Sequence, residues 1–600
     1  MAKKKQKVEI KHSKYQEAIF DFIQHGVGNL VVEASAGSGK SYTLLKCLEL
    51  VDKEQRILLS AFNRDIVTEL KKKSKNLENV HVMTLHGLGL SMLQRNYPNA
   101  ELELDEFKYR SYVWTNIKNL SKIDLGELPN RDYARYVDNV CQYVSYGRCY
   151  LCQTVRDLEL IEERYDIDTY ADEKEVALDV IEWGKNNLSI IDFTDMIYLP
   201  NALMCKPLGL QFDWIAVDEA QDLSTAQREI VLKCRKLNTR MLFFGDSNQC
   251  VYMFNSSDPE SFNALKDLPN TTSLPLSISY RCAKRIVDFA KEIVPSIEEN
   301  GDGREGEIKY DVQLEEVQDG DMIICRNNAP LMQIYTDFLK LGKKCAIRGK
   351  DIGGNLAHMV AKTKCDTLQR NFVHEGVFPK LYDSLLKSIY ELMGRYNITF
   401  EDAVSSSSIS IRYDMVMALE ILSEGLKTSE ELIAKIGEVF SDRKKVGISL
   451  STIHKAKGLE ANNVYVACRS LMPSSSAKKD WEVLQERNLM YVAYTRAKDK
   501  LGFLDESSFE KYSKSSERIN RLHAIEGMLE PIYGKSSKSV DASNPYVAKD
   551  IIRHATRIEK PKSVDKVMSL TGTMARPKED GIGLLGSIMK RKVERKKKIR

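Results

Sequence analysis

The sequence of 600 residues lacks the long apolar segments of a membrane protein. No run approaches the roughly 20 consecutive apolar residues that a transmembrane helix needs, which excludes helical membrane proteins as a class. The N-terminal stretch MAKKKQKVEIKH also lacks the apolar core of a secretory signal. We therefore expect an intracellular protein, cytosolic or nuclear, with no membrane partner.

The chain has little net charge: 89 Lys and Arg against 85 Asp and Glu leave only +4. The overall field is therefore too weak to attract nucleic acid, and any such affinity must come from local basic surface. Basic residues gather at both ends, in Lys3 to Lys7 and in Lys590 to Arg600. Such runs are solvated tails, phosphate-binding segments or localisation signals.

The sequence also lacks a metal or disulfide framework. Its twelve cysteines are scattered, which in an intracellular chain predicts reduced thiols. Cys141, Cys149 and Cys152 lie close together, the last two as C-x-x-C, but zinc or an iron–sulfur cluster needs a fourth ligand and no second C-x-x-C follows. Ordinary thiols are the favoured interpretation, and a metal site is the alternative.

A phosphate-binding loop is the clearest positive signal. Asn29 to Glu33 predicts a short buried strand, followed by small residues, two glycines, a lysine and a hydroxyl before a helix from Tyr42. The glycines let backbone N–H groups surround phosphates, Lys40 can reach the β- and γ-phosphates, and Ser41 can ligate Mg²⁺. The strict pattern G-x-x-x-x-G-K-[ST] has glycine where this chain has Ala34, so a chance glycine turn is the alternative. The predicted nucleotide contacts are Ala36, Gly37, Ser38, Gly39, Lys40, Ser41 and Tyr42.

A pair of carboxylates supplies the second half of a nucleotide-hydrolysing site. The apolar strand from Asp213 ends in Asp218 and Glu219. Asp218 would hold Mg²⁺ through water, and Glu219 would orient and deprotonate the attacking water. A further strand, Arg240 to Phe244, leads to Gln249, which we expect to sense the γ-phosphate. Upstream of the loop, Gln16 can bond both edges of an adenine, or it is a surface glutamine.

Polar and aromatic residues follow two further predicted strands, Arg56 to Ala61 and Val80 to Met83. The ends of parallel strands are where such folds bind ligands. Aromatic rings can stack bases while Arg, Thr and His hold phosphates, although a core Phe is the simpler alternative for Phe62. The nucleic-acid contacts predicted at these two strand ends are Phe62, Asn63, Arg64, Thr84 and His86. Tyr252 and Phe254, which follow Gln249, are predicted to stack bases as well.

Taken in order, these motifs resemble the UvrD/Rep family of superfamily 1 DNA helicases, from about Tyr15 to Leu504. The segments IDFTD, LSISYR, VGISLSTIHKAKGLE and QERNLMYVAYTRA complete the resemblance, with Ser279 where the family usually has Asn. The resemblance implies that Tyr280 stacks on adenine, that Arg281 and Arg496 reach the γ-phosphate, that Glu460 faces the ribose and that Thr452 and His454 face DNA. Arg496 would be the arginine finger.

The resemblance implies an α/β fold of two RecA-like P-loop NTPase domains, whose parallel sheets are flanked by helices and each carry a mainly α-helical insertion. The expected limits are 1–92 and 188–275 for domain 1A, 93–187 for insertion 1B, 276–353 and 446–505 for domain 2A, 354–445 for a short insertion 2B, and 506–600 for an accessory region with a basic, flexible tail.

The expected function is an ATP-dependent DNA helicase that uses ATP and Mg²⁺, binds single-stranded DNA and single-strand/double-strand junctions, and works with replication or repair proteins. The resemblance implies 3′→5′ polarity and a compact, phage- or virus-type member, acting in the cytoplasm, at the nucleoid or in a host cytoplasm, with a nuclear location compatible with the basic termini. The alternatives are a translocase that displaces bound proteins with little unwinding, which the short insertion favours, and a non-catalytic binding protein.

Overall fold

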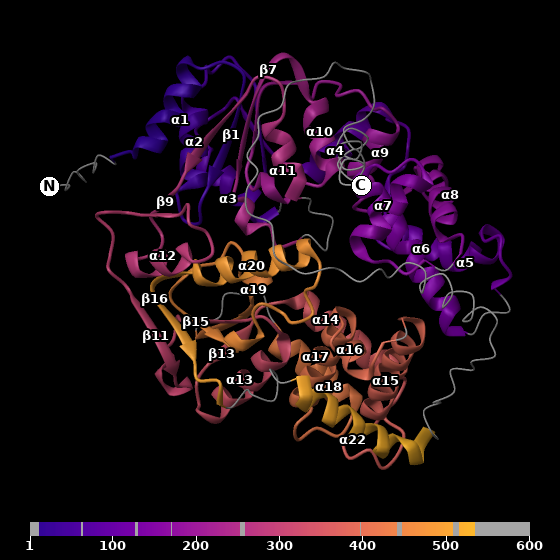
Figure 1. Cartoon of the computed structure of the whole chain (residues 1–600). Coiled ribbons are helices and arrows are strands. Elements are labelled where there is room, and N and C mark those ends of the chain that lie inside the picture. Colours follow the sequence, from indigo (N-terminus) through magenta and orange to yellow (C-terminus); the bar gives the residue numbers. More distant parts are fainter. Residues whose placement is uncertain are drawn as a thin grey trace, which may run out of the picture. The chain divides into compact units, whose positions relative to one another are not determined.

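The computed structural model describes residues 11–61, 64–125, 130–169, 171–252, 259–396, 398–440, 447–507 and 515–533. Within this part of the chain, helices flank two six-stranded sheets (Figure 1). The predicted contacts Phe62, Asn63 and Phe254 lie outside the described residues, as do both basic termini and the side chain of Arg64.

The first sheet has the order β3-β2-β6-β7-β1-β8, and all neighbouring strands are parallel. Its central strands are buried on both faces, which is why they appear in the sequence as continuous apolar runs. Leu30, Leu44 and Leu48 share one core beneath the phosphate loop. The strands are β1 Asn29–Ala34, β2 Ile57–Ala61, β3 Val80–Thr84, β6 Phe212–Val217, β7 Arg235–Gly245 and β8 Thr271–Leu276.

Helices of the first half flank this sheet. The capping box of α1, in which Ser13 and Gln16 satisfy each other's backbone N–H groups, fixes where that helix begins. The helices are α1 Lys14–His25, α2 Lys40–Glu49, α3 Arg64–Lys73, α4 Leu85–Asn96, α9 Asp195–Ala202, α10 Thr225–Lys233 and α11 Pro259–Lys266.

The first insertion is built from α5 Lys108–Leu120, α6 Asn130–Tyr150, α7 Val155–Tyr165 and α8 Glu173–Asn186. A two-stranded sheet of β4 Glu103–Leu104 and β5 Ile190–Ile191 closes its base. The sequence prediction did not include β4, because two residues are too few to produce an alternating pattern.

A buried ionic cluster joins this insertion to the first sheet's helices. Asp195, which is fully buried, pairs with Lys108 at 2.7 Å and with Arg148 at 2.9 Å, and it accepts a hydrogen bond from Tyr109. Arg148 also pairs with Asp192 at 2.7 Å. Since Asp192 and Asp195 belong to the IDFTD segment, one role of that segment is to hold the insertion in place.

We expect Asp195→Asn to loosen the first insertion. The change leaves the Lys108 ammonium, whose side chain is 1% exposed, without a carboxylate. Breaking one side of a buried ion pair costs about 3–5 kcal/mol. Hydrogen exchange should show the opening free energy of α5–α8 falling by about that amount. The matched control is Asp138→Asn, whose pair with Arg110 is more than half exposed and should matter by less than about 1 kcal/mol. Equal effects in the two variants would contradict the assigned role.

The second sheet has the order β11-β16-β15-β12-β14-β13, again with parallel neighbours. The prediction of two parallel α/β sheets is thereby confirmed. The elements are β11 Glu307–Val312, β12 Met322–Cys325, β13 Cys345–Ile347, β14 Ile448–Thr452, β15 Ala461–Ala467 and β16 Ala497–Leu504, with α12 Lys284–Lys291, α13 Asn328–Lys340, α19 Ile453–Ala456 and α20 Asp480–Tyr494, and the short pair β9 Ile278–Ser279 and β10 Glu298–Glu299.

The second insertion contains α14 Lys350–Lys362, α15 Val377–Tyr396, α16 Phe400–Val404, α17 Ser407–Leu422 and α18 Ser429–Val439. A helix from the predicted accessory region, α22 Ser515–Tyr533, packs against α15 and α16. Leu522, Ile525 and Leu529 are buried there. Sequence analysis expected an accessory region with a basic, flexible tail from residue 506 and did not predict this helix.

Among the described helices, none is long and apolar enough to cross a membrane.

Candidate functional site

The predicted phosphate loop connects β1 to α2 with two residues in the left-handed region, Gly37 at φ 73° and Gly39 at φ 79°. A Cβ on Gly37 would lie 2.4 Å from the Cβ of Arg281, so this position requires glycine for its dihedral and for its close approach to the second half. The hydroxyl of Ser38 is buried and has no hydrogen-bond partner among the residues that the structure describes. The loop therefore retains an unused polar group beside its backbone N–H groups.

The two carboxylates at the end of β6 face this loop. Lys40 Nζ lies 2.7 Å from Glu219 Oε1, and the Ser41 hydroxyl donates to Asp218 Oδ2 at 2.9 Å. Glu219 has φ 56°, and its other oxygen accepts a bond from Gln221. The strained backbone at Glu219 directs its carboxylate toward Lys40.

Electrostatics couple these groups. Burial opposes the charge on Lys40, yet Glu219 and Asp218 raise the pKa of that ammonium. Burial also opposes ionisation of Glu219, but Lys40 and Lys457 lower its pKa to about 2. Burial raises the pKa of Asp218, with Glu219 adding to the effect. Glu219 is therefore an ionised and weak base for as long as Lys40 holds it.

The opposite wall comes from the second half of the chain. Arg281 pairs with Glu460 at 2.7 Å, and Lys498 pairs with the other oxygen of Glu460 at 2.6 Å. Arg281 also donates to the carbonyl of Thr495. Arg281 and Glu460 thus lie together beside the phosphate loop.

Arg496 is almost fully buried and donates to Gln249 Oε1 at 3.2 Å, although the two residues are 247 positions apart. Its other bonds go to backbone carbonyls of Val492 and Leu459 and to the Thr495 hydroxyl. Burial, with help from nearby Arg281, lowers the pKa of Arg496 to about 9. Within the described part of the chain no carboxylate pairs with this guanidinium, so its charge is stabilised poorly until an anion arrives.

Direct bonds join the two walls. The Ala36 amide donates to Tyr491 Oη at 2.9 Å, and the Tyr280 amide donates to the Gly37 carbonyl at 2.9 Å. Lys457 pairs with buried Asp222 at 2.6 Å and donates to the Gln249 carbonyl. Sequence analysis gave Asp222 and Lys457 no role in this contact, although Lys457 lies inside the quoted segment VGISLSTIHKAKGLE.

These residues surround a cleft of about 600 Å³. Its lining includes most of the predicted nucleotide residues, namely Gly37, Ser38, Gly39, Lys40, Ser41, Tyr42, Glu219, Gln249, Tyr280, Arg281, Glu460 and Arg496, together with Tyr252.

Three predicted residues do not line that cleft. Asp218 lies behind Ser41, and the Ala36 amide is already bonded to Tyr491. Gln16 is buried; its oxygen accepts from the Ser13 amide and its nitrogen donates to the Thr43 hydroxyl at 3.1 Å. Gln16 would have to exchange these bonds to contact an adenine.

The residues of the first half that are predicted to contact nucleic acid lie at the ends of β3 and of the short helix η3 Ser247–Gln249. Thr84 caps α4 through the Gly87 amide, and His86 lies 6.5 Å from the ring of Phe193. Phe193 is 38% exposed, and sequence analysis gave it no role because only the fold brings it beside His86. Tyr252 donates to the carbonyl of His454 at 3.0 Å, which brings the two sets of contacts together.

The second half has two predicted nucleic-acid contacts, Thr452 and His454. They line a second cavity of about 400 Å³ together with Arg326 and Trp481. Thr452 caps α19 through the Lys455 amide. Burial, together with the charge of Arg326, lowers the pKa of His454 to about 3. His454 is therefore neutral at physiological pH and can contact a base or sugar without adding charge.

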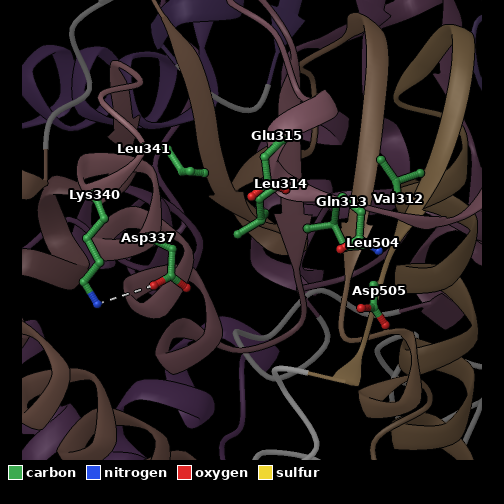
Figure 2. A pocket seen from close by; sticks show the side chains of 9 residues that line it. All are labelled: Val312, Gln313, Leu314, Glu315, Asp337, Lys340, Leu341, Leu504 and Asp505. Atoms are coloured by element: carbon green, nitrogen blue, oxygen red, sulfur yellow. Dashed lines mark ion pairs between the residues drawn. The ribbon is translucent and has the colours of Figure 1, made fainter.

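A third cavity, of about 370 Å³, lies beside α13 and the ends of β11 and β16. Figure 2 shows its nine lining residues, with Lys340 and Asp337 forming an ion pair at 3.8 Å. None of the predicted site residues that the structure describes contributes to it.

The cysteine group shows no metal geometry in the described residues, where no cluster of three or more His, Cys, Asp or Glu side chains could hold an ion. Cys141 and Cys149 are half-buried and Cys152 is buried. Burial raises the pKa of Cys141 to about 11, which keeps this thiol protonated.

The large cleft fits a nucleoside triphosphate with Mg²⁺. Cationic side chains of Lys40, Arg281 and Arg496 converge on it, and the free hydroxyl of Ser38 and the glycine backbone are suited to phosphate oxygens. The Ser41 hydroxyl and the Asp218 carboxylate supply the oxygen ligands that Mg²⁺ prefers.

Comparison with known proteins agrees with this geometry. The UvrD/REP helicase N-terminal domain model matches residues 15–270, which contain the phosphate loop and both carboxylates. The UvrD-like helicase C-terminal domain model matches residues 386–506, which contain Glu460 and Arg496.

Individual relatives are distant. The chain is 25% identical to F-box DNA helicase protein 1 of Schizosaccharomyces pombe, over 79% of this chain and 55% of that protein. It is 25% identical to the ATP-dependent DNA helicase Rep of Buchnera aphidicola, over 44% of this chain and 43% of Rep. It is 22% identical to the ATP-dependent DNA helicase PcrA of Staphylococcus aureus, over 79% of this chain and 80% of PcrA.

The chain thus spans about half the length of the first two of these relatives. Both halves of one helicase family are nevertheless matched in the expected order, and the matched segments carry the residues that line the cleft. From these matches we conclude that the chain belongs to the UvrD/Rep-like family of superfamily 1 helicases.

Proposed function

We propose that this protein is an ATP-dependent DNA helicase that moves along single-stranded DNA with 3′→5′ polarity and unwinds duplex at single-strand/double-strand junctions. One observation carries the proposal: the cleft takes Lys40 and Glu219 from the first half and Arg281 and Arg496 from the second. A site divided in this way can complete its chemistry only when the two halves close on the nucleotide.

The ion pair between Lys40 and Glu219 supports a resting state. With the Lys40 ammonium 2.7 Å away, the Glu219 carboxylate is a poor base. Phosphates would draw Lys40 from it, which raises the basicity of Glu219 and lets it orient and deprotonate the attacking water. Mg²⁺, held by Ser41 and Asp218, would neutralise charge on the phosphate oxygens.

Gln249 connects the nucleotide cleft to the proposed DNA contacts. Its side chain accepts from Arg496, while its carbonyl accepts from Lys457 and the chain continues to Tyr252. The Tyr252 hydroxyl bonds to the carbonyl of His454, a proposed DNA contact of the other half. Any shift of Gln249 toward a γ-phosphate would therefore alter contacts on both sides of the strand.

For the strand itself, we propose stacking of bases on Tyr252 and Phe193 and contacts from Thr84, His86, Thr452 and His454. A base stacked on an aromatic ring contributes about 1–3 kcal/mol, which is enough to hold a strand and still release it in each cycle.

A translocase that displaces bound proteins with little unwinding is a second candidate. The second insertion, which lies between β13 and β14, is short, and this favours the translocase. The packing of α22 on α15 and α16 enlarges the same insertion and favours unwinding instead.

We expect ATP-dependent unwinding of a duplex with a 3′ single-stranded overhang, and little unwinding of the same duplex with a 5′ overhang or blunt ends. Strand separation and ATP turnover would be measured together over a salt series. Binding should weaken steeply with salt, because phosphate contacts release counterions. Turnover stimulated by single strands without unwinding, but with displacement of a protein block, would support the second candidate. Turnover indifferent to DNA would refute both.

A further inference from the structure

The first insertion touches the second half of the chain at a point far from the nucleotide cleft. The Trp481 indole N–H donates to the carbonyl of Arg164 at 2.9 Å, across 317 residues of sequence. The ring centroids of Trp481 and Tyr165 are 5.8 Å apart, and Lys479 Nζ lies 3.5 Å from Asp166 Oδ1. We call this contact, Arg164 to Asp166 against Lys479 to Trp481, the bridge.

The residues on both sides of the bridge are held in place by their own helices and neighbours. Tyr165 stacks on Tyr146 of α6, with ring centroids 4.0 Å apart and an interplanar angle of 9°. The Arg164 guanidinium lies 5.5 Å from the ring centroid of Tyr150. Trp481 is the second residue of α20, so its position is set by the same helix that reaches the nucleotide cleft. The bridge therefore joins two ordered helix ends.

The bridge and the nucleotide cleft lie at opposite ends of α20. Tyr491, near the C-terminal end, bonds to Ala36, while Trp481 at the N-terminal end bonds to Arg164. Ten residues of helix separate them by about 15 Å. Trp481 also lines the cavity that contains Thr452 and His454, the proposed strand contacts of this half. The two halves of the chain thus contact each other on both sides of Thr452 and His454.

We propose that the bridge closes the DNA groove, so that the protein encloses a single strand and the bridge must open to admit or release a strand that has no free end. This rests on the proposed function, because enclosure has meaning only if DNA runs past Thr452 and His454. One neutral hydrogen bond, one tilted aromatic contact and one partly exposed ion pair are individually weak, so the bridge can open without unfolding either half.

The test measures how fast the protein is released from closed circular single-stranded DNA in the presence of ATP and an excess of competitor oligonucleotide. Trp481→Phe keeps a ring but loses the N–H donor, and we expect release about 3- to 10-fold faster. The turnover number at saturating single-stranded DNA should change by less than about twofold in Lys479→Glu, since Lys479 lines neither the nucleotide cleft nor the cavity that contains Thr452 and His454. Trp114→Phe, which alters an exposed tryptophan of the same insertion, is the matched control and should release like the unaltered protein.

A charge swap provides an independent arm. Lys479→Glu alone should speed release, and combining it with Asp166→Lys should restore much of the original rate, which a general loss of structure would not do. Release from circles that is the same in Trp481→Phe, Lys479→Glu and Trp114→Phe, in a protein whose turnover DNA still stimulates, would overturn the enclosure. Loss of DNA stimulation in the unaltered protein would instead overturn the proposed function.

Discussion

Lys40→Ala abolishes ATP turnover but leaves single-stranded DNA binding largely intact: this is the largest effect that we expect. The Lys40 ammonium is the cation nearest the carboxylates and lies at the start of α2, directly after the glycines. Loss of one positioned charge of this kind lowers the turnover number by at least about 10²- to 10³-fold. The measurements are the turnover number with saturating oligonucleotide and the dissociation constant for the same oligonucleotide.

Lys46→Ala is the matched control, because Lys46 lies on the same helix and its ion pair with Glu49 is partly exposed. Its turnover should equal that of the unaltered protein. If Lys40→Ala lost DNA affinity as strongly as turnover, the separation of nucleotide and strand contacts proposed above would be wrong.

Arg496→Met should lower the turnover number by about 10³-fold while changing nucleotide affinity little. The guanidinium lies beside Gln249 and would neutralise charge that develops on the γ-phosphate during cleavage. Its action is needed in the transition state more than in the bound substrate, so the turnover number should fall and the affinity should not.

The same variant makes an opposite prediction for stability. Because burial and Arg281 lower the pKa of Arg496, its charge is unfavourable in the nucleotide-free protein. Arg496→Met should therefore leave the thermal midpoint of the nucleotide-free protein unchanged or higher. A fall in turnover of less than about tenfold would rule out an arginine finger at this position, and a large drop in the midpoint would mean that Arg496 is mainly structural.

Local patterns predicted much of this site. The phosphate loop was readable because strand, glycines, lysine and hydroxyl are neighbours in sequence, and Asp218 with Glu219 followed an apolar strand that the structure shows as β6. The strand predicted at Arg240 to Phe244 lies within β7, which extends from Arg235 to Gly245. Its exposed first residues carry no apolar signal, so only the buried half was visible.

Other features left no local trace. Gln16 matched a nucleotide contact by position, but its amide serves the capping box of α1 and Thr43. Helix α22 buries Leu522, Ile525 and Leu529 against a partner more than 100 residues earlier, and its own sequence shows little periodicity because its remaining faces are mixed. Phe193 gained interest only when the fold brought it beside His86.

By itself, then, the sequence determined the apolar strands, the predicted phosphate loop and the order of the motifs, since each can be read from neighbouring residues, and the family resemblance of those motifs implied the two parallel sheets. Only the tertiary structure decided that Arg496 meets Gln249, that Lys40 is held by Glu219 and that the Trp481 indole donates to Arg164 of the first insertion. Such contacts join side chains that are hundreds of positions apart, and their partners are chosen by how sheets and helices pack, which no local periodicity encodes.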